Sequence, residues 1–243
     1  MTRFFVLPDE LAERNPILTG ENGKHAAVLR LRAGEEVILC DGEGQECRCA
    51  VLENRGGEYI LEALERRASP SEPGIRAAVY MAYAKGDKLE HVIQKATELG
   101  AYEIVTFPSA RCVSRPEEKS LEKKLERWQK IARSAAEQSG RGRIPRVTAV
   151  ESYAQALARA GKADLGILFY ENEHAHTLRQ TLAEGPFHTV SFITGPEGGL
   201  EAREVEEAER AGLRVCTLGR RILRCETAPL CALSAVMFAS GEF

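Results

Sequence analysis

From Ile75 onward the sequence alternates short runs of β-branched and aromatic residues with longer runs of helical composition. The short runs predict buried strands, and the longer amphipathic runs predict helices. Six such pairs predict an α/β fold with a mainly parallel sheet covered on both faces, because parallel neighbours need a crossover long enough for a helix. The predicted strands are Arg76–Tyr83, Tyr102–Phe107, Val147–Val150, Leu165–Tyr170, Thr189–Thr194 and Arg214–Leu218. The predicted helices are Asp87–Leu99, Glu117–Gln138, Tyr153–Ala160, His174–Ala183, Leu200–Ala211 and one from about Ala228 to Ala239.

The first 72 residues follow another pattern, with closely spaced strand-like runs and one short helix. Turn signals of the Asp-Gly and Gly-Gly type in Asp41–Gly44 and Asn54–Gly57 separate these runs, which predicts a small β-barrel. Because Ser69–Gly74 has the composition of a linker, we expect one domain at 1–72 and a second at 73–243. The predicted strands are Arg3–Val6, Glu36–Cys40, Glu46–Glu53 and Glu58–Leu64, and the predicted helix is Lys24–Arg30.

Charge is distributed unevenly along the chain. The net charge of −3 argues against a uniformly basic nucleic-acid binder. Residues 1–72 contain nine basic and fourteen acidic side chains, whereas Arg111–Arg146 contains eleven basic and five acidic ones. A positive stripe on an otherwise acidic protein is typical of a surface that binds a polyanion.

The sequence has no apolar run long enough to cross a membrane and no signal peptide pattern, since Pro8, Asp9 and Glu10 follow the opening residues at once. We therefore expect a soluble, cytoplasmic protein that does not bind membranes. Seven cysteines in a chain of this length predict reduced thiols. Cys47 and Cys49 lack the spacing and the second pair of a zinc site, so we expect no metal.

Glycine-rich loops follow the last two predicted strands. Gly195–Gly199 comes directly after one strand, and Gly219–Thr227 follows the next. Loops at the carboxyl ends of parallel strands are where α/β proteins bind ligands, and glycine lets a ligand approach the backbone. Neither loop has the Gly-Lys-Ser/Thr of a phosphate-binding loop, and Gly199 is followed by Leu200 and the carboxylate of Glu201. A cationic or zwitterionic ligand that carries an adenine suits these loops better than a nucleoside triphosphate.

Five segments of the chain form a recognisable set: Lys85–Glu90, Gln94–Gly100, Ala136–Arg141, Gly195–Gly199 and Leu218–Ala228. Together and in this order they resemble the RsmE family, the uridine-N3 methyltransferases of small-subunit (16S) ribosomal RNA in the SPOUT superfamily. The opening Arg3–Val6 and the stretch His25–Gly42 also resemble the PUA-like N-terminal domain of that family, so the resemblance spans nearly the whole chain.

The resemblance implies a PUA-like β-barrel followed by an α/β SPOUT domain whose C-terminal segments form a trefoil knot. It also implies that S-adenosylmethionine binds inside the knot, and that two copies form a homodimer through the knots, to which the apolar last helix, Pro229–Ala239, is suited. The cofactor-binding residues that it implies are Leu168, Phe169, Tyr170, Glu171, Thr194, Gly195, Pro196, Glu197, Gly198, Gly199, Leu218, Gly219, Ile222, Leu223, Arg224, Thr227 and Ala228.

Methylation of uridine at N3 requires loss of the imide proton, so a base and donors for the flanking carbonyl oxygens are expected. Arg224, with Arg221, is the candidate donor, and Glu226 or Glu197 is the candidate base. Other roles remain open for each: the arginines as phosphate anchors, Glu226 as a cap of the following helix, and Glu197 as a partner of its own loop's amides.

RNA contacts are expected from the positive stripe, because phosphate contacts by Lys and Arg give affinity. Cations between Lys119 and Lys130 could instead pair with Glu118, Glu122 and Glu126 on one helix face. For Gln138–Arg143, where glycines loosen the chain beside the charges, we favour an RNA role. The candidate RNA-binding residues are Arg3, His25, Arg30, Lys85, Lys88, Arg111, Gln138, Arg141, Arg143 and Arg221.

Two residues depart from the family pattern: Thr194 stands where an aliphatic residue is usual, and Cys112 where a serine-like one is. Neither is an expected catalytic group. The expected partner is 16S rRNA or the small ribosomal subunit. Two alternatives remain at this point, a knotted RNA methyltransferase that acts on another atom such as a ribose 2′-hydroxyl, and a catalytically silent RNA-binding ribosome assembly factor.

Overall fold

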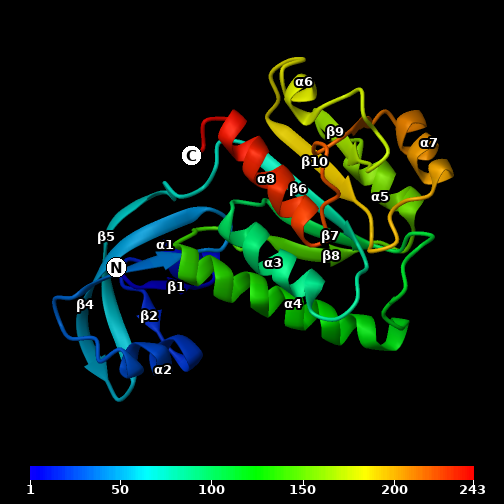
Figure 1. Ribbon diagram of the computed structural model, residues 1–243. Helices are drawn as coiled ribbons and strands as arrows, with labels where there is room; N and C mark the ends of the chain where they lie inside the picture. The colour runs from blue at the N-terminus through cyan, green and yellow to red at the C-terminus, as the bar shows by residue number, and fades with distance from the viewer. The chain divides into compact units, whose positions relative to one another are not determined.

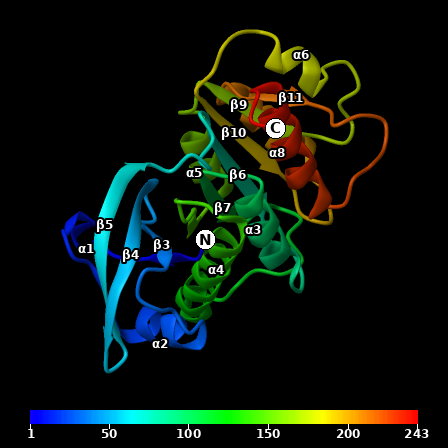
Figure 2. The same cartoon turned by 90° about the vertical axis from the view of Figure 1, so that its left-hand side faces the viewer.

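The computed structural model describes residues 1–243 and separates into two compact units (Figures 1 and 2). The first contains Met1–Glu72 and Ala136–Ile144, and the second contains Pro73–Ala135 and Pro145–Phe243. The sequence assigns 136–144 to the second domain, because this stretch continues a long helix that begins there. Its contacts make it part of the first unit.

The first unit is built on a five-stranded sheet with the order β1-β3-β4-β5-β2. All neighbours are antiparallel except β1 and β3. The edge strands β1 and β2 have only three and two residues, and the unit as a whole is the small β domain that the sequence predicted. The elements are β1 (Arg3–Phe5), α1 (Pro8–Ala12), β2 (Ile17–Leu18), α2 (Gly20–Val28), β3 (Glu36–Cys40), β4 (Gln45–Arg55) and β5 (Glu58–Ala68).

The core of this unit holds two of the cysteines considered as possible ligands. Cys47 and Cys49 are fully buried with Phe4, Leu39 and Leu61, and their Sγ atoms lie 3.6 Å apart. Burial and the neighbouring Cys47 raise the pKa of Cys49 to about 12. Both thiols therefore behave as small apolar core groups.

Glu72 attaches the returning segment to this unit. Its carboxylate accepts a 2.6 Å hydrogen bond from Arg141 Nη2 and 3.0 Å bonds from the backbone N–H groups of Gly142 and Arg143. The Arg141 side chain is 3% exposed, so it has no free surface for RNA. This corrects the predicted RNA contact by Arg141, whose charge stabilises the unit instead.

The second unit is built on a six-stranded parallel sheet with the order β11-β9-β10-β6-β7-β8. The alternation of strands and helices confirms the predicted α/β fold. The elements are β6 (Arg76–Ala82), α3 (Lys88–Glu98), β7 (Glu103–Phe107), α4 (Glu118–Ser139), β8 (Arg146–Ala149), α5 (Tyr153–Ala160), β9 (Leu165–Phe169), α6 (Leu178–Leu182), β10 (Thr189–Thr194), α7 (Ala202–Arg210), β11 (Arg214–Cys216) and α8 (Thr227–Ala239).

Helices cover both faces of this sheet, as predicted for parallel strands. On one face α3 and α8 pack together, and α8 lies against β6 and β10 (Figure 1). On the other face α5 and α7 pack over alternate strand residues that include Tyr80, Phe107 and Ile193. Successive residues of each strand point to opposite faces of the sheet, because the side-chain period of a strand is two.

The order of the strands places three loops together. Strands β6, β7 and β8 lie side by side in chain order. The chain then returns to the other side of β6, where β10 lies between β6 and β9. The carboxyl ends of β9, β10 and β11 therefore meet at one edge, which is the usual ligand site of an open parallel sheet. Strand order does not test the trefoil knot, which stays a prediction.

The α6 helix is shorter than the predicted 174–183. The Glu173 carboxylate accepts hydrogen bonds from the N–H groups of Ala175 and His176, which folds these residues into a turn. Thr177 then caps the helix and forms a capping box with Gln180. Among all the helices of the structure, none combines the length and the hydrophobicity needed to cross a membrane.

Glu46 provides a test of the first unit's stability. Its side chain is 2% exposed and accepts hydrogen bonds from Arg3, Arg67 and Ser69. Burial by itself would raise the pKa of Glu46, but these bonds outweigh burial and lower the pKa below its ordinary value. We expect Glu46→Gln to lower the free energy of unfolding by about 2–4 kcal/mol at pH 7.

Because the folded pKa is lowered, the contribution of Glu46 is present above its ordinary pKa and is lost as the pH falls through the folded value. Urea denaturation should show that the difference in unfolding free energy between wild type and Glu46→Gln is smaller in acid than at pH 7. Glu36→Gln is the control, since its pair with Arg48 is exposed, and should cost less than about 1 kcal/mol. An equal cost for both variants would contradict the expectation.

Candidate active site

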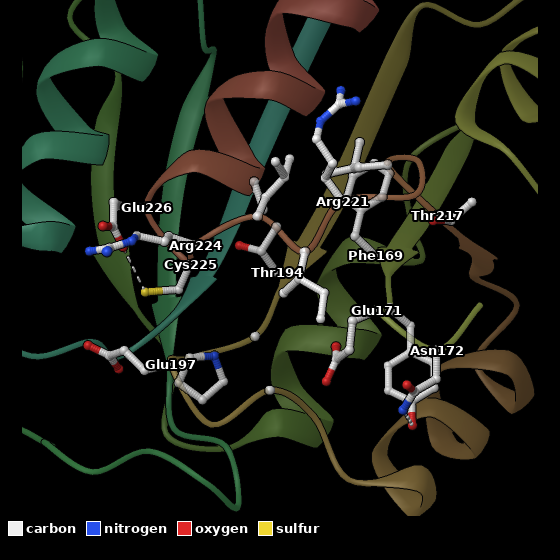
Figure 3. Close-up of a pocket in the computed structure, with 18 of the residues that line it drawn as sticks. Phe169, Glu171, Asn172, Thr194, Glu197, Thr217, Arg221, Arg224, Cys225 and Glu226 are labelled. Carbon is white, nitrogen blue, oxygen red and sulfur yellow. Dashed lines mark hydrogen bonds between the residues drawn. The ribbon is translucent and has the colours of Figure 1, made fainter. Parts of the chain in front are cut away.

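A cavity of about 700 Å³ opens at the carboxyl ends of β9, β10 and β11 (Figure 3). Its walls come from the three loops that follow these strands, with Lys88 from the first turn of α3. Cys225, Glu226 and Glu197 gather on one side in Figure 3, with Glu171 and Asn172 on the other and Thr194 between them. Loops far apart in the sequence thus form one pocket.

Gly199 allows two of these loops to approach each other closely. Its φ is +70°, and a Cβ there would lie 2.4 Å from Glu171 Oε1. Its N–H donates to Pro196 O at 3.0 Å, which closes the turn. Any larger residue would therefore strain the backbone and push away the loop that follows β9. The structure gives the Glu171 carboxylate no hydrogen bond or ion pair within the protein, so it is available to a ligand.

Glu197 joins the glycine loop to the start of α3. Its Oε1 accepts the backbone N–H of Lys85 at 2.9 Å and the Lys88 ammonium at 3.0 Å. Burial would raise the pKa of Glu197, but these bonds outweigh it and lower the pKa. The carboxylate is thus ionised at neutral pH and bound to another loop, whereas the sequence alternative considered only its own loop.

Glu226 lies beside Glu197 on the same side of the cavity. Lys88 Nζ is 3.9 Å from Glu226 Oε2, and the Cys225 thiol donates to that oxygen at 3.2 Å (Figure 3). Burial would raise the pKa of Glu226, but hydrogen bonds from its own backbone N–H and from Cys225, together with the charge of Lys88, lower it. Burial raises the pKa of the Cys225 thiol to about 12, so the thiol keeps its proton.

The alternative that Glu226 caps the last helix is only half right. Glu226 occupies the N-cap position of α8, but its side chain makes no capping hydrogen bond. Arg224 O accepts the N–H groups of Thr227 and Ala228 at 2.9 and 3.0 Å, so the main chain itself begins the helix. The Glu226 carboxylate is therefore left to the cavity.

Arg224 and Arg221 both line the cavity and are exposed. In Figure 3 the Arg224 side chain lies alongside Cys225 and Glu226, whereas Arg221 lies near Phe169. The charge of Arg224 also helps to lower the pKa of Glu226. Arg224 thus stands next to the carboxylate, and Arg221 stands apart from it.

Most of the predicted cofactor residues line this cavity, and two do not. Leu168 is fully buried and packs with Tyr80 and Ile193 in the core, because alternate residues of β9 face the helices. Thr227 is exposed and lies in the first turn of α8. The prediction also missed lining residues in the same loops, and it placed Lys88 with RNA alone. The additional lining residues are Asn172, His174, Thr217, Arg220 and Cys225.

Three candidate RNA residues of the second unit contact the glycine loop. Lys85 and Lys88 bind Glu197, and Arg111 Nη1 donates to Gly198 O at 3.2 Å. A Cβ on Gly198 would lie 3.0 Å from Arg111 Cβ, so this position also needs glycine. These residues shape the site, Lys85 through its backbone N–H, whether or not their side chains also contact RNA.

The RNA candidates of the first unit divide into bound and exposed side chains. Arg3 is largely buried against Glu46 at 2.7 Å, and Arg143 donates to Glu43 O. These two charges are engaged within the unit, where the sequence predicted free cations. The exposed candidates are His25, Arg30 and Gln138, of which Arg30 has a positive φ of 56°.

The two departures from the family pattern have local explanations. The Thr194 hydroxyl donates to Tyr80 O at 3.3 Å in the neighbouring strand, so a polar residue is tolerated inside the sheet. The Cys112 Sγ accepts the N–H of Ser109 at 3.3 Å. Each polar group is thus satisfied at its position.

The position of Lys88 between two carboxylates yields a prediction. Because its charge lowers the pKa of both Glu197 and Glu226, Lys88→Met should raise both pKa values. Carboxyl ¹³C titration of glutamate-labelled protein, assigned with Glu197→Gln and Glu226→Gln, measures this. Lys95→Met is the control, since Lys95 pairs with Glu98 on the same helix. Unchanged midpoints in Lys88→Met would contradict the prediction.

Comparisons with known proteins agree with this architecture. The profile of an RNA methyltransferase domain matches residues 71–237, and that of an RNA methyltransferase PUA domain matches residues 18–62. The chain is 37% identical to the ribosomal RNA small subunit methyltransferase E of Bacillus subtilis, over 98% of this chain and 96% of that protein. It is 34% identical to the enzyme of the same name from Mycobacterium bovis, over 90% of this chain and 85% of that protein.

Solved structures show the same fold. The crystal structure of a ribosomal RNA small subunit methyltransferase E from Neisseria gonorrhoeae, bound to S-adenosylmethionine, superposes with a TM-score of 0.85 at 31% identity, covering 98% of this chain and 97% of that one. The structure of a putative methyltransferase from Legionella pneumophila, in complex with the same cofactor, superposes with a TM-score of 0.82 at 28% identity, and 98% of each chain is covered. With a PUA-like β unit, a parallel α/β unit and relatives over nearly its whole length, the chain belongs to the ribosomal RNA small subunit methyltransferase E (RsmE) family of the SPOUT superfamily.

Proposed function

We propose that this chain transfers the methyl group of S-adenosylmethionine to N3 of a uridine in the 16S rRNA of the small ribosomal subunit. The observation that carries the proposal is an ionised Glu226 beside Arg224, at the edge of a cavity whose glycine walls leave room for a ligand. Relatives with the same fold bind S-adenosylmethionine, which supports the choice of cofactor.

The residues of the cavity fit this cofactor. Gly195 and Gly199 keep the wall free of side chains, since a Cβ at either would lie within 3.0 Å of a neighbour. Glu171 offers a free carboxylate, a group that commonly accepts hydrogen bonds from ribose hydroxyls. Phe169 and Tyr170 provide aromatic surface at the end of β9. When bound, S-adenosylmethionine supplies an electrophilic methyl group on a positively charged sulfur.

The proton of uridine N3 needs an acceptor, and Glu226 is better suited than Glu197. Glu197 already accepts two hydrogen bonds at one oxygen, from Lys85 and Lys88. From other residues Glu226 accepts only the Cys225 thiol at 3.2 Å, and Lys88 lies farther away at 3.9 Å. We therefore infer that Glu226 accepts the N3 proton and that Glu197 holds the loops in position.

Loss of that proton places negative charge on the two carbonyl oxygens beside N3. Arg224, next to Glu226, is the proposed donor to one of them, and its main chain is held by the first turn of α8. Arg221, on the other side of the cavity, is then left for an RNA phosphate. Fixed donors at the site where charge develops lower the barrier, and alignment of the two reactants contributes more.

We further propose that the enzyme is a homodimer that associates through α8. This helix is apolar on nearly all sides: it buries Leu233, Val236 and Met237 against its own unit while Cys231 and Phe238 stay exposed. A helix that is apolar all round is usually covered on every side. A second copy covers this face and brings its own cavity near the boundary.

Identification of the methylated atom tests the proposed function. Ribosomal RNA from a strain that lacks the gene, with and without complementation, should contain N3-methyluridine only when the chain is present, as measured by mass spectrometry of nucleosides. A ribose 2′-O-methyl product would refute N3 as the target. If calorimetry detected no binding of S-adenosylmethionine and no methylated product formed, an RNA-binding assembly factor would be the better assignment.

Gly199 tests the cavity wall. Gly199→Ala should weaken binding of S-adenosylmethionine at least about tenfold by calorimetry, because the added methyl group displaces Glu171 and strains the turn. Gly212→Ala is a matched control: its φ is +86°, and nothing lies within 4 Å of its Cβ position. Equal affinity in the two variants would argue against cofactor binding at this wall.

Arg224 tests the chemistry. Because it acts on charge that develops only in the transition state, Arg224→Ala should lower kcat about 100-fold. The Kd for S-adenosylmethionine should change less than about threefold. Arg210→Ala, an exposed arginine paired with Glu206, is the control and should leave both values unchanged. Parallel losses of kcat and cofactor affinity in Arg224→Ala would assign this side chain to cofactor binding.

A further inference from the structure

We propose that a second pocket, beside the catalytic cavity, binds a nucleotide that flanks the target uridine in the RNA. The proposal rests on the proposed function for the identity of its ligand. The pocket has a volume of about 410 Å³, which falls in the range of small-ligand sites. It lies wholly within the second unit, between the start of α3, the middle of α4 and the segment before α4.

Two of the residues that line this pocket carry a polar group without a partner in the protein. Tyr83 is 6% exposed and Trp128 is 5% exposed, yet neither the hydroxyl nor the indole N–H has a hydrogen-bond partner in the protein. Thr106 Oγ1 is the one fully enclosed side-chain polar atom without a partner, so solvent reaches the Tyr83 hydroxyl and the Trp128 N–H. A ligand in the pocket would replace water as the partner of these two groups.

The chemistry of these groups suits a nucleobase. Burial raises the pKa of Tyr83 to about 12, so its hydroxyl keeps the proton and can donate or accept. The indole N–H can only donate. Together with Leu89 they provide an apolar floor with two polar points, and proteins enclose unpaired RNA bases on surfaces of this kind.

The rim of the pocket carries charges of both signs. Lys124 and Arg127 come from α4, and Asp87 and Glu90 come from α3. Arg127 donates to Glu90 at 2.7 Å, yet it is 70% exposed and keeps other N–H groups for a phosphate. The carboxylates suit exocyclic amino groups and ribose hydroxyls. This mixture favours a whole nucleotide over a bare anion.

Two segments connect the pocket to the catalytic cavity. Lys88 lines the cavity, while its neighbours Asp87 and Leu89 line the second pocket. Likewise, Arg111 contacts the glycine loop, and Ser114 reaches the second pocket. The first turn of α3 thus separates the two spaces. A nucleotide next to the target in a single strand is therefore the natural occupant.

Trp128 is the only tryptophan in the chain, so intrinsic fluorescence reports on this pocket directly. We expect saturable fluorescence changes with at least one nucleoside 5′-monophosphate, and weaker ones with the matching nucleoside or inorganic phosphate. Saturating S-adenosylmethionine should not abolish the signal. Equal saturation by phosphate alone, displacement by S-adenosylmethionine, or no change at all would each overturn the proposal.

Variants connect the pocket to RNA. Tyr83→Phe should weaken nucleotide binding about fivefold, as expected for one lost hydrogen bond. It should raise the KM for RNA by a similar factor while kcat and cofactor affinity stay near wild type. Lys124→Ala should act similarly, and Lys162→Ala, an exposed lysine outside both the pocket and the positive stripe, should not. Thermal unfolding confirms that each variant is folded.

The fluorescence titration requires no methyl transfer, so the two proposals can fail separately. Nucleotide binding at Trp128 in a protein that forms no N3-methyluridine would refute the proposed function alone. Normal methylation with an unchanged KM in Tyr83→Phe would refute the second pocket alone.

Discussion

The candidate active-site cavity depends on one carboxylate that joins separate parts of the chain. Glu197 follows β10, and it accepts the backbone N–H of Lys85 and the ammonium group of Lys88 at the start of α3. Lys88 in turn approaches Glu226 from the loop before α8. An ion pair in a partly enclosed site is stronger than at an open surface, because less water screens it. The parallel sheet brings the loops together, and these charges hold them in place.

The same charges prepare the chemistry that we propose. Lys88 helps to lower the pKa of both carboxylates, while the Cys225 thiol stays protonated and occupies one oxygen of Glu226. A carboxylate that is ionised but only lightly engaged can accept a proton. The glycines of the loop after β10 leave room for the cofactor. The proposed proton acceptor and the cofactor thus share one cavity.

Positive charge in this sequence is a poor guide to RNA contact. Arg141 lies in the basic segment that the sequence favoured most, yet its side chain is buried against Glu72. Arg3 is similarly bound to Glu46. The sequence could not reveal these pairs, since their partners are about forty or more positions away. The unpartnered groups of Tyr83 and Trp128 were equally hidden, because solvent access and hydrogen bonding are properties of the folded chain.

The sequence alone determined the α/β pattern and the family, and it predicted the three loops that line the cavity. These follow from local periodicity, turn chemistry and segments whose residues are adjacent in the chain. Only the tertiary structure decided which cations are free, that Glu197 binds the loop before α3 and that Leu168 belongs to the core. It also decided the return of 136–144 to the first unit. Each of these depends on partners distant in sequence, which pack together only when the strands and helices assemble.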